Sequence, residues 1–218
     1  DYYASRGLGD VYKRQIRAQQ GCGVPTVKPW DRETLMQKLD LALTADPMAI
    51  AMDIDAAGLP FLRNRMPPAG SKTVAELREV AEHARKPFIL KGIMTVRGAE
   101  KAVEAGASAI VVSNHGGRVL DQCPATAEVL PAIADAVGDR VMVLVDGGIR
   151  TGLDVFKALA LGADGVLIGR PFVTMVYGGG EEGVAAYVRK LTDELSDTMA
   201  MCGAHSLKEI DREMLWQG

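Results

Sequence analysis

The chain has 218 residues, of which 48% are hydrophobic and 24% charged, a composition typical of a globular protein that buries a sizeable core. Its net charge of −3, without a long basic cluster or a bilayer-length apolar run, argues against nucleic acid and membranes as partners. The three cysteines form no C-x-x-C pair, which argues against a disulfide framework or a structural zinc site and favours a reducing, cytoplasmic environment.

Six short, mostly apolar runs predict parallel strands covered by helices on both faces. In chain order they are Val24–Lys28, Ala49–Asp55, Phe88–Lys91, Ala109–Ser113, Val141–Asp146 and Gly165–Gly169. Helical patterns separate them, and three begin with N-cap signals at Asp31, Thr73-x-x-Glu76 and Thr151-x-x-Asp154. The expected helices cover residues 31–43, 73–84, 95–106, 123–138, 151–162 and 182–201, with a short turn at 206–209.

Strands that alternate with helices predict an α/β fold, either a doubly wound open sheet or a (β/α) barrel. The dinucleotide fingerprint G-x-G-x-x-G is absent, because Gly7-x-Gly9 and Gly21-x-Gly23 both lack the third glycine. The last two strands end in the glycine- and arginine-containing segments Asp146–Arg150 and Ile168–Pro171. Barrels often bind phosphate in the corresponding loops, so these segments favour a barrel with a phosphate site.

A histidine and an arginine follow the fourth expected strand, in the segment Ser113–Arg118. Barrel strands deliver their carboxyl-terminal residues to the active-site mouth. His115 is suited to removing a proton near neutral pH, and Arg118 to gripping a substrate carboxylate. The alternative is an ordinary loop histidine beside an exposed arginine.

Three charged residues stand at the ends of other expected strands. Lys91 either reaches solvent or directs a cation at a ligand. Asp53 and Asp55 are expected on one face, where a carboxylate could orient a neighbouring base, or they are simply solvated. We expect no metal site, because no third ligand lies near these aspartates in the sequence.

Five segments together resemble the FMN-dependent 2-hydroxy-acid oxidases and dehydrogenases, a family that includes glycolate oxidase, lactate oxidase and the flavin domain of flavocytochrome b2. They are Lys91–Gly92, Ser113–Asp121, Pro124–Thr126, Asp146–Ala158 and Gly169–Pro171. The resemblance implies a (β/α)₈ TIM barrel with FMN as cofactor, represented here by about six of the eight βα units. It implies oxidation of an L-2-hydroxy acid similar to lactate or glycolate to the 2-keto acid. It also implies transfer of electrons to oxygen or another acceptor, and a homo-oligomer, since many relatives are tetramers.

The resemblance also implies roles for single residues. His115 is placed as the base, Asp55 as its partner, Arg118 as the substrate carboxylate ligand and Lys91 as the cation beside flavin N1 and the C2 carbonyl. The residues implied to contact the cofactor are Asp53, Lys91, Ser113, Asp146, Gly147, Gly148, Arg150, Gly169 and Arg170.

Several segments depart from the family pattern. Asp53 stands where the family has a threonine, and Val24–Trp30 does not match the usual polar strand that contacts flavin. The long connection 56–72 is expected to act as a lid. Residues 1–15 resemble translated adaptor sequence and are assigned to a spurious or disordered segment, which leaves 16–218 as a partial FMN-binding barrel with C-terminal helices.

Two alternatives to the hydroxy-acid chemistry stay open at this point. One is an FMN barrel of other chemistry, such as a type 2 isopentenyl-diphosphate isomerase, which would explain the phosphate loops but not Arg118. The other is an inert barrel fragment, whose outer strands would have unpaired edges at Val24–Lys28 and Gly165–Gly169.

Overall fold

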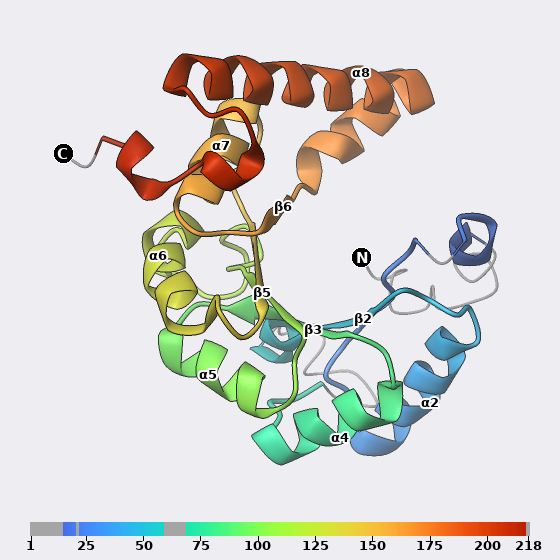
Figure 1. Cartoon of the computed structure of the whole chain (residues 1–218). Coiled ribbons are helices and arrows are strands. Elements are labelled where there is room, and N and C mark those ends of the chain that lie inside the picture. The colour runs from blue at the N-terminus through green and yellow to red at the C-terminus, as the bar shows by residue number, and fades with distance from the viewer. Residues whose placement is uncertain (1–14, 21, 59–68, 217–218) are drawn as a thin grey trace.

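A computed structural model describes residues 15–20, 22–58 and 69–216 of the chain. Its centre is a single sheet of parallel strands in the order β1-β2-β3-β4-β5-β6, so that each strand pairs with the next in the sequence (Figure 1). The strands are β1 (Thr26–Val27), β2 (Ile50–Asp53), β3 (Phe88–Ile93), β4 (Ala109–Val112), β5 (Met142–Asp146) and β6 (Gly165–Leu167).

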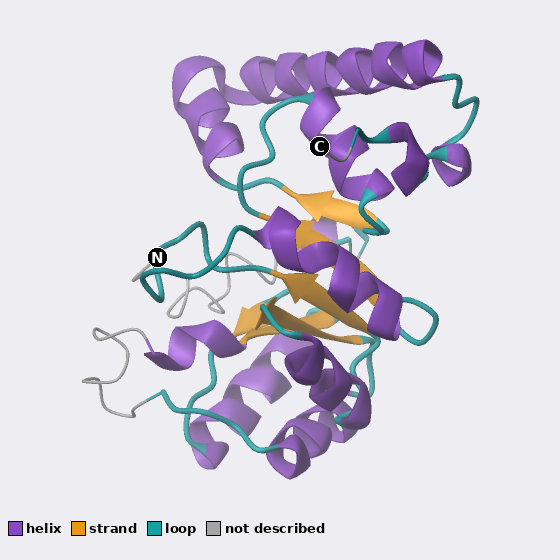
Figure 2. Cartoon of the chain, turned by 90° about the vertical axis from the view of Figure 1, so that its left-hand side faces the viewer, coloured by secondary structure: helices purple, strands orange, loops and turns teal. Residues whose placement is uncertain are grey.

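Helices follow the strands and cover the outside of the sheet (Figures 1 and 2). They are α2 (Arg32–Leu43), α4 (Val74–Ala84), α5 (Val96–Glu104), α6 (Thr126–Val137), α7 (Gly152–Ala160) and α8 (Arg170–Cys202). Short 3₁₀ helices are η1 (Ile54–Gly58), η2 (Leu207–Glu209) and η3 (Arg212–Met214). Among the described residues, no helix combines the length and the apolar character needed to cross a membrane.

The strand order decides between the two architectures that the sequence allowed. A doubly wound sheet reverses its strand order at a switch point, whereas the wall of a (β/α) barrel keeps strictly sequential neighbours. All five pairings here are parallel and sequential. The prediction of a (β/α) barrel wall made of six units is therefore confirmed.

The N-cap signals place three of the helices as predicted. The Asp31 side chain accepts a hydrogen bond from the amide of Thr34 at the start of α2. Complete capping boxes begin α4 at Thr73 and α7 at Thr151. Between helices and sheet, the side chains of the central strands form the core, and many of them are fully buried.

One predicted helix start is wrong, and one helical stretch was not predicted. The helix expected from Cys123 begins at Thr126, with Ala125 as its N-cap. The helix expected from 182 corresponds to the part of α8 that follows a kink at Gly180, where φ is +54° and ψ is −139°, and the stretch from Arg170 to that kink was not predicted. Glycine tolerates this conformation, so the chain changes direction there and continues as a second helical stretch.

Two expectations fall largely on residues that are not described, and a third concerns the outer strands. Residues 1–14 contain most of the segment assigned as spurious or disordered, and 59–68 contain most of the segment predicted to act as a lid. The strand edges expected to be unpaired belong to β1 and β6, which are the outermost strands of the described sheet.

Candidate active site

A cavity of about 770 Å³ lies at the carboxyl ends of the strands, on the side where a barrel places its active site. Most of the site residues predicted from the sequence line it. These are Asp53, Lys91, His115, Arg118, Asp146, Gly147, Gly148, Arg150, Gly169 and Arg170. Asp55 and Ser113 are the two predicted site residues outside this lining, and each contacts a residue that belongs to it.

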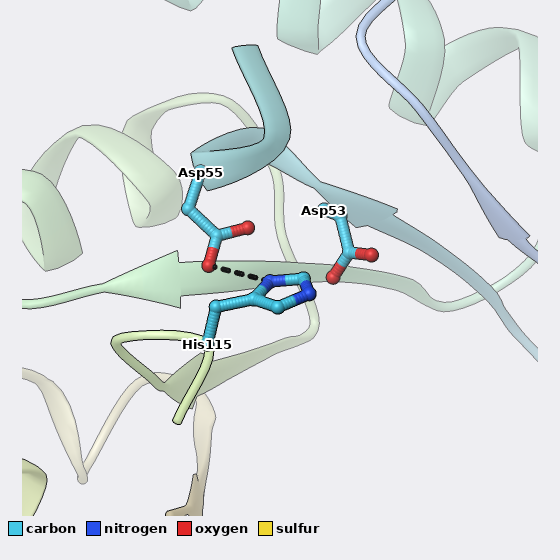
Figure 3. A group of neighbouring side chains, drawn as sticks. All are labelled: Asp53, Asp55 and His115. Carbon is cyan, nitrogen blue, oxygen red and sulfur yellow. Dashed lines mark hydrogen bonds and ion pairs between the residues drawn. The ribbon is translucent and has the colours of Figure 1, made fainter. Parts of the chain in front are cut away.

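His115 and Asp55 form a hydrogen-bonded pair beside this cavity (Figure 3). Nδ1 of His115 lies 3.1 Å from Oδ2 of Asp55, and the side chains are only 14% and 9% exposed. A carboxylate that accepts from Nδ1–H fixes the tautomer in which Nε2 is the free base. This arrangement supplies a general base in a largely buried position.

We expected Asp55 to lie at the end of the strand, but β2 ends at Asp53. Asp55 lies instead in η1, the 3₁₀ turn that follows β2. The turn packs against a β-bulge in β3 at Gly92, where φ is +104°. A Cβ atom at Gly92 would lie 2.7 Å from Cβ of Asp55 and 2.9 Å from its backbone nitrogen. Glycine is therefore required at Gly92 for Asp55 to reach His115.

The loop that carries His115 has an unusual backbone. His115, Gly116 and Gly117 have φ values of +58°, +69° and +75°, in the left-handed region that a histidine seldom adopts. Ser113 Oγ accepts from the His115 amide at 3.1 Å, and Arg118 Nε donates to the His115 carbonyl at 3.0 Å. Backbone strain of this kind clusters at functional sites, where surrounding contacts hold it.

Lys91 lies between two carboxylates. Its Nζ donates to Ser113 Oγ at 2.9 Å and lies 3.5 Å from an oxygen of Asp53 and 3.3 Å from one of Asp146. The side chain is 17% exposed, so this cation is largely removed from bulk water. A lysine held in this way can stabilise negative charge that develops on a ligand in the cavity.

The sequence did not predict Lys28 or Thr26, both of which line the cavity. Nζ of Lys28 lies 2.5 Å from Oδ2 of Asp53. Burial raises the pKa of Asp53, but the positive charges of Lys28 and then Lys91 outweigh burial and hold that pKa below its usual value. The available signal was the alternation of polar residues at 26 and 28, which places both on one face of a strand.

Glycine loops and arginines form another part of the cavity. Gly147 and Gly148 have φ values of +92° and +82°, which leave their backbone exposed to a ligand. A Cβ atom at Gly116 would lie 2.7 Å from the guanidinium of Arg170. Backbone N–H groups together with arginine side chains are a typical phosphate site, which agrees with the prediction for these segments.

The structure also brings together three groups that could ligate a metal. One oxygen from each of Asp53 and Asp55 and one ring nitrogen of His115 lie within 4.8 Å of one another. The sequence pattern missed the third member, because His115 is 60 residues from Asp55. Asp53 is already paired with Lys28, and Asp55 with His115, so the contacts favour an acid–base role for the cluster.

Comparisons with known proteins agree with this geometry. The family model for FMN-dependent dehydrogenase matches residues 13–217. A 2-hydroxyacid oxidase of Dictyostelium discoideum is 44% identical over 146 residues, which are 67% of this chain and 38% of that protein. Glycolate oxidase of Spinacia oleracea is 48% identical over 135 residues, 61% of this chain and 37% of that protein. The chain thus spans about two fifths of the length of these curated relatives.

Solved structures give the same result for the fold. A crystal structure of mandelate oxidase matches 92% of this chain and 65% of its own length, with a TM-score of 0.82 and 34% sequence identity. Both the resemblance noted in the sequence and the expected barrel architecture are therefore confirmed.

Proposed function

Because the chain belongs to the FMN-dependent dehydrogenase family, we propose that it carries the active-site residues of an oxidoreductase that converts an L-2-hydroxy acid to the 2-keto acid. The observation that carries the proposal is the His115–Asp55 pair, which lies beside the cavity that Arg118 also lines. A base next to a carboxylate-binding cation is what this reaction requires.

FMN is the cofactor of this family, and the cavity fits it. The volume of about 770 Å³ lies within the range of cofactor sites. The backbone of Gly147 and Gly148, with Arg150 and Arg170, would hold the phosphate, and Lys91 would lie against the ring system. When bound, FMN would supply the two-electron acceptor of the reaction.

The side chains of the protein would bind the substrate and transfer the proton. Arg118 would bind the substrate carboxylate and so direct its hydroxyl-bearing carbon towards His115. Nε2 of His115 would take the proton of the hydroxyl group or of the α-carbon, and Asp55 would stabilise the imidazolium that forms. We propose a small substrate such as lactate or glycolate, with oxygen or another acceptor taking the electrons afterwards.

Anaerobic mixing of the FMN-loaded chain with L-lactate or glycolate tests this function. The visible absorbance of oxidised flavin should bleach, and the variant His115→Asn should bleach at least 100-fold more slowly. His205→Asn is the matched control, since His205 is an exposed histidine in the C-terminal segment. A chain that binds FMN and does not bleach with either acid would contradict the proposal.

The isomerase alternative predicts a different result. It accounts for the phosphate-binding segments but gives no role to a carboxylate-binding arginine near the base. Turnover of an isoprenoid diphosphate, without bleaching by a hydroxy acid, would support that chemistry in place of the oxidation.

A further inference from the structure

Asp53 places a second carboxylate next to His115. One of its oxygens lies within 4.8 Å of a ring nitrogen of His115 and of an Asp55 oxygen. Figure 3 shows the two carboxylates on different sides of the ring, with Asp53 near the nitrogen that Asp55 does not contact. The nitrogen facing Asp53 is the one that the proposed function assigns to proton abstraction.

Lys28 holds this second carboxylate in place. Its Nζ contacts Oδ2 of Asp53 at 2.5 Å, and the two side chains are 17% and 9% exposed. A buried carboxylate without such a partner tends to take up a proton and become neutral. Within the described residues, no hydrogen bond or ion pair joins Lys28 directly to His115, so Lys28 can act on the ring only through Asp53 or across space.

We propose that Lys28 and Asp53 are positioning residues that strengthen His115 as a base: Lys28 keeps Asp53 ionised, and the Asp53 carboxylate favours the protonated ring. This inference rests on the proposed function for its consequence in turnover, but the charge effect itself can be measured without turnover.

The other charged groups around the pair are consistent with this role. Asp53 faces Lys28 from the residue that follows β1, Lys91 from β3 and His115 from the loop after β4. His115 faces Asp55 from η1 as well as Asp53, and Arg118 contacts only its backbone carbonyl. Lys91 lies 3.5 Å from Asp53 and also contacts Asp146, whereas Lys28 lies 2.5 Å from Asp53. Lys28 is therefore the closer counter-ion of Asp53.

The first test is a nuclear magnetic resonance titration of the His115 ring in the full chain. The chain has three histidines, so His83→Asn and His205→Asn leave only His115 to observe. In this background, Asp53→Asn and Asp53→Thr should each move the His115 titration midpoint to lower pH, because a neutral side chain no longer favours the protonated ring. Two different neutral residues are used so that the result does not depend on the folding of one variant.

The matched control is Asp46→Asn. Asp46 also forms an ion pair with a lysine, Lys86, at 2.6 Å, but its side chain is 89% exposed. This control should leave the midpoint in place. An unchanged midpoint in the Asp53 variants, or an equal shift in the control, would overturn the proposal.

Lys28→Met, alone and in the Asp53→Thr background, tests the part played by Lys28. Alone, it removes the counter-ion that keeps Asp53 ionised, so the His115 midpoint should move down. In the Asp53→Thr background the carboxylate is already absent, so Lys28→Met should not move the midpoint down further. A midpoint that stays in place or rises in Lys28→Met alone would show that Asp53 stays ionised without Lys28, and that half of the proposal would be wrong.

The pH dependence of turnover by the FMN-loaded chain gives a second measurement, in which the direction of the shift identifies the effect of Asp53. In Asp53→Asn, the acidic limb of the kcat/KM pH profile should move down by the same amount, while the rate on the plateau falls because the base is weaker. A general loss of structure would lower the rate without moving the limb. If no hydroxy acid is turned over, the proposed function fails, and the ring titration still decides the role of Asp53.

Discussion

His115 and Asp55 are 60 positions apart in the sequence, and the structure joins them by a 3.1 Å contact between Nδ1 and Oδ2. The contact depends on two separate loops, one after β2 and one after β4, which meet because parallel strands end at the same edge of the sheet.

Replacing Asp55 with asparagine should slow flavin reduction by about 100-fold or more, because the amide no longer fixes the productive tautomer or stabilises the imidazolium. Stopped-flow absorbance of the FMN-loaded chain measures the rate. Asp40→Asn is the control, since Asp40 contacts His83 at 2.7 Å in another, exposed His–Asp pair. Equal rates for Asp55→Asn and Asp40→Asn would contradict the assignment.

Arg118→Lys should raise KM for the hydroxy acid by roughly 10- to 100-fold, because an ammonium group does not reproduce the bidentate hydrogen bonding of a guanidinium to a carboxylate. The effect on kcat should be smaller. Steady-state kinetics with Arg140→Lys as a surface control separate the two parameters. A fall in kcat at constant KM would instead assign Arg118 to the chemical step.

Arg170→Met should weaken FMN binding by about 10-fold or more, as expected for the loss of a charge-assisted contact to phosphate. Flavin fluorescence titration measures the dissociation constant. Riboflavin, which lacks the phosphate, should bind the variant and the wild type equally. Arg189→Met replaces an exposed arginine and should leave FMN binding unchanged.

Gly92→Ala should destabilise the chain by about 1–3 kcal/mol, since the new Cβ meets Asp55 and φ is +104°. Urea unfolding followed by circular dichroism measures the loss. Gly58→Ala, at the end of η1, has no heavy atom within 4 Å of the added Cβ and should change stability much less. A comparable loss in both variants would exclude the packing explanation.

The capping carboxylate of α7 should make stability depend on pH. Burial raises the pKa of Asp154, but hydrogen bonds from Thr151 and from the amide of Arg150 outweigh it and lower that pKa. Because the pKa is depressed in the folded state, its contribution is present above the unfolded value of about 3.9 and is lost as pH falls through the folded value.

Asp154→Asn should therefore cost about 1 kcal/mol in the free energy of unfolding at pH 7 and progressively less below about pH 4. Urea unfolding at both pH values measures the difference. Asp139→Asn, at an exposed carboxylate, should show no such dependence. A cost that stays constant with pH would show that the Asp154 charge does not contribute.

Local signals in the sequence predicted the fold well. The capping boxes at Thr73 and Thr151 and the buried strands depend on residues close together in the chain, where spacing and side-chain chemistry determine the structure. The helix expected from 182 to 201 corresponds to the part of α8 after the kink at Gly180, but the helical stretch between Arg170 and that kink was not predicted. Whether a glycine interrupts a helix depends on tertiary packing, which the sequence pattern does not contain.

The site was predicted from strand-end residues and from the family motifs, and most of those residues line one cavity. Lys28 was missed because its significance depends on Asp53, which is 25 positions away and on the neighbouring strand. The bulge at Gly92 was missed for the same reason, since only its contact with Asp55 shows why glycine is required there. Pairing between distant segments is the information that one sequence lacks.

The strand register limits how the chain can change in length. Asp53 and Lys91 are register partners on β2 and β3, and both reach the cavity. Successive strand residues point to opposite faces, so one residue inserted before Lys91 within β3 would turn its ammonium group towards the helices. We therefore expect single-residue insertions and deletions to be tolerated in the turn near Asp139, far from the cavity, and to eliminate flavin binding when they fall within β2 or β3.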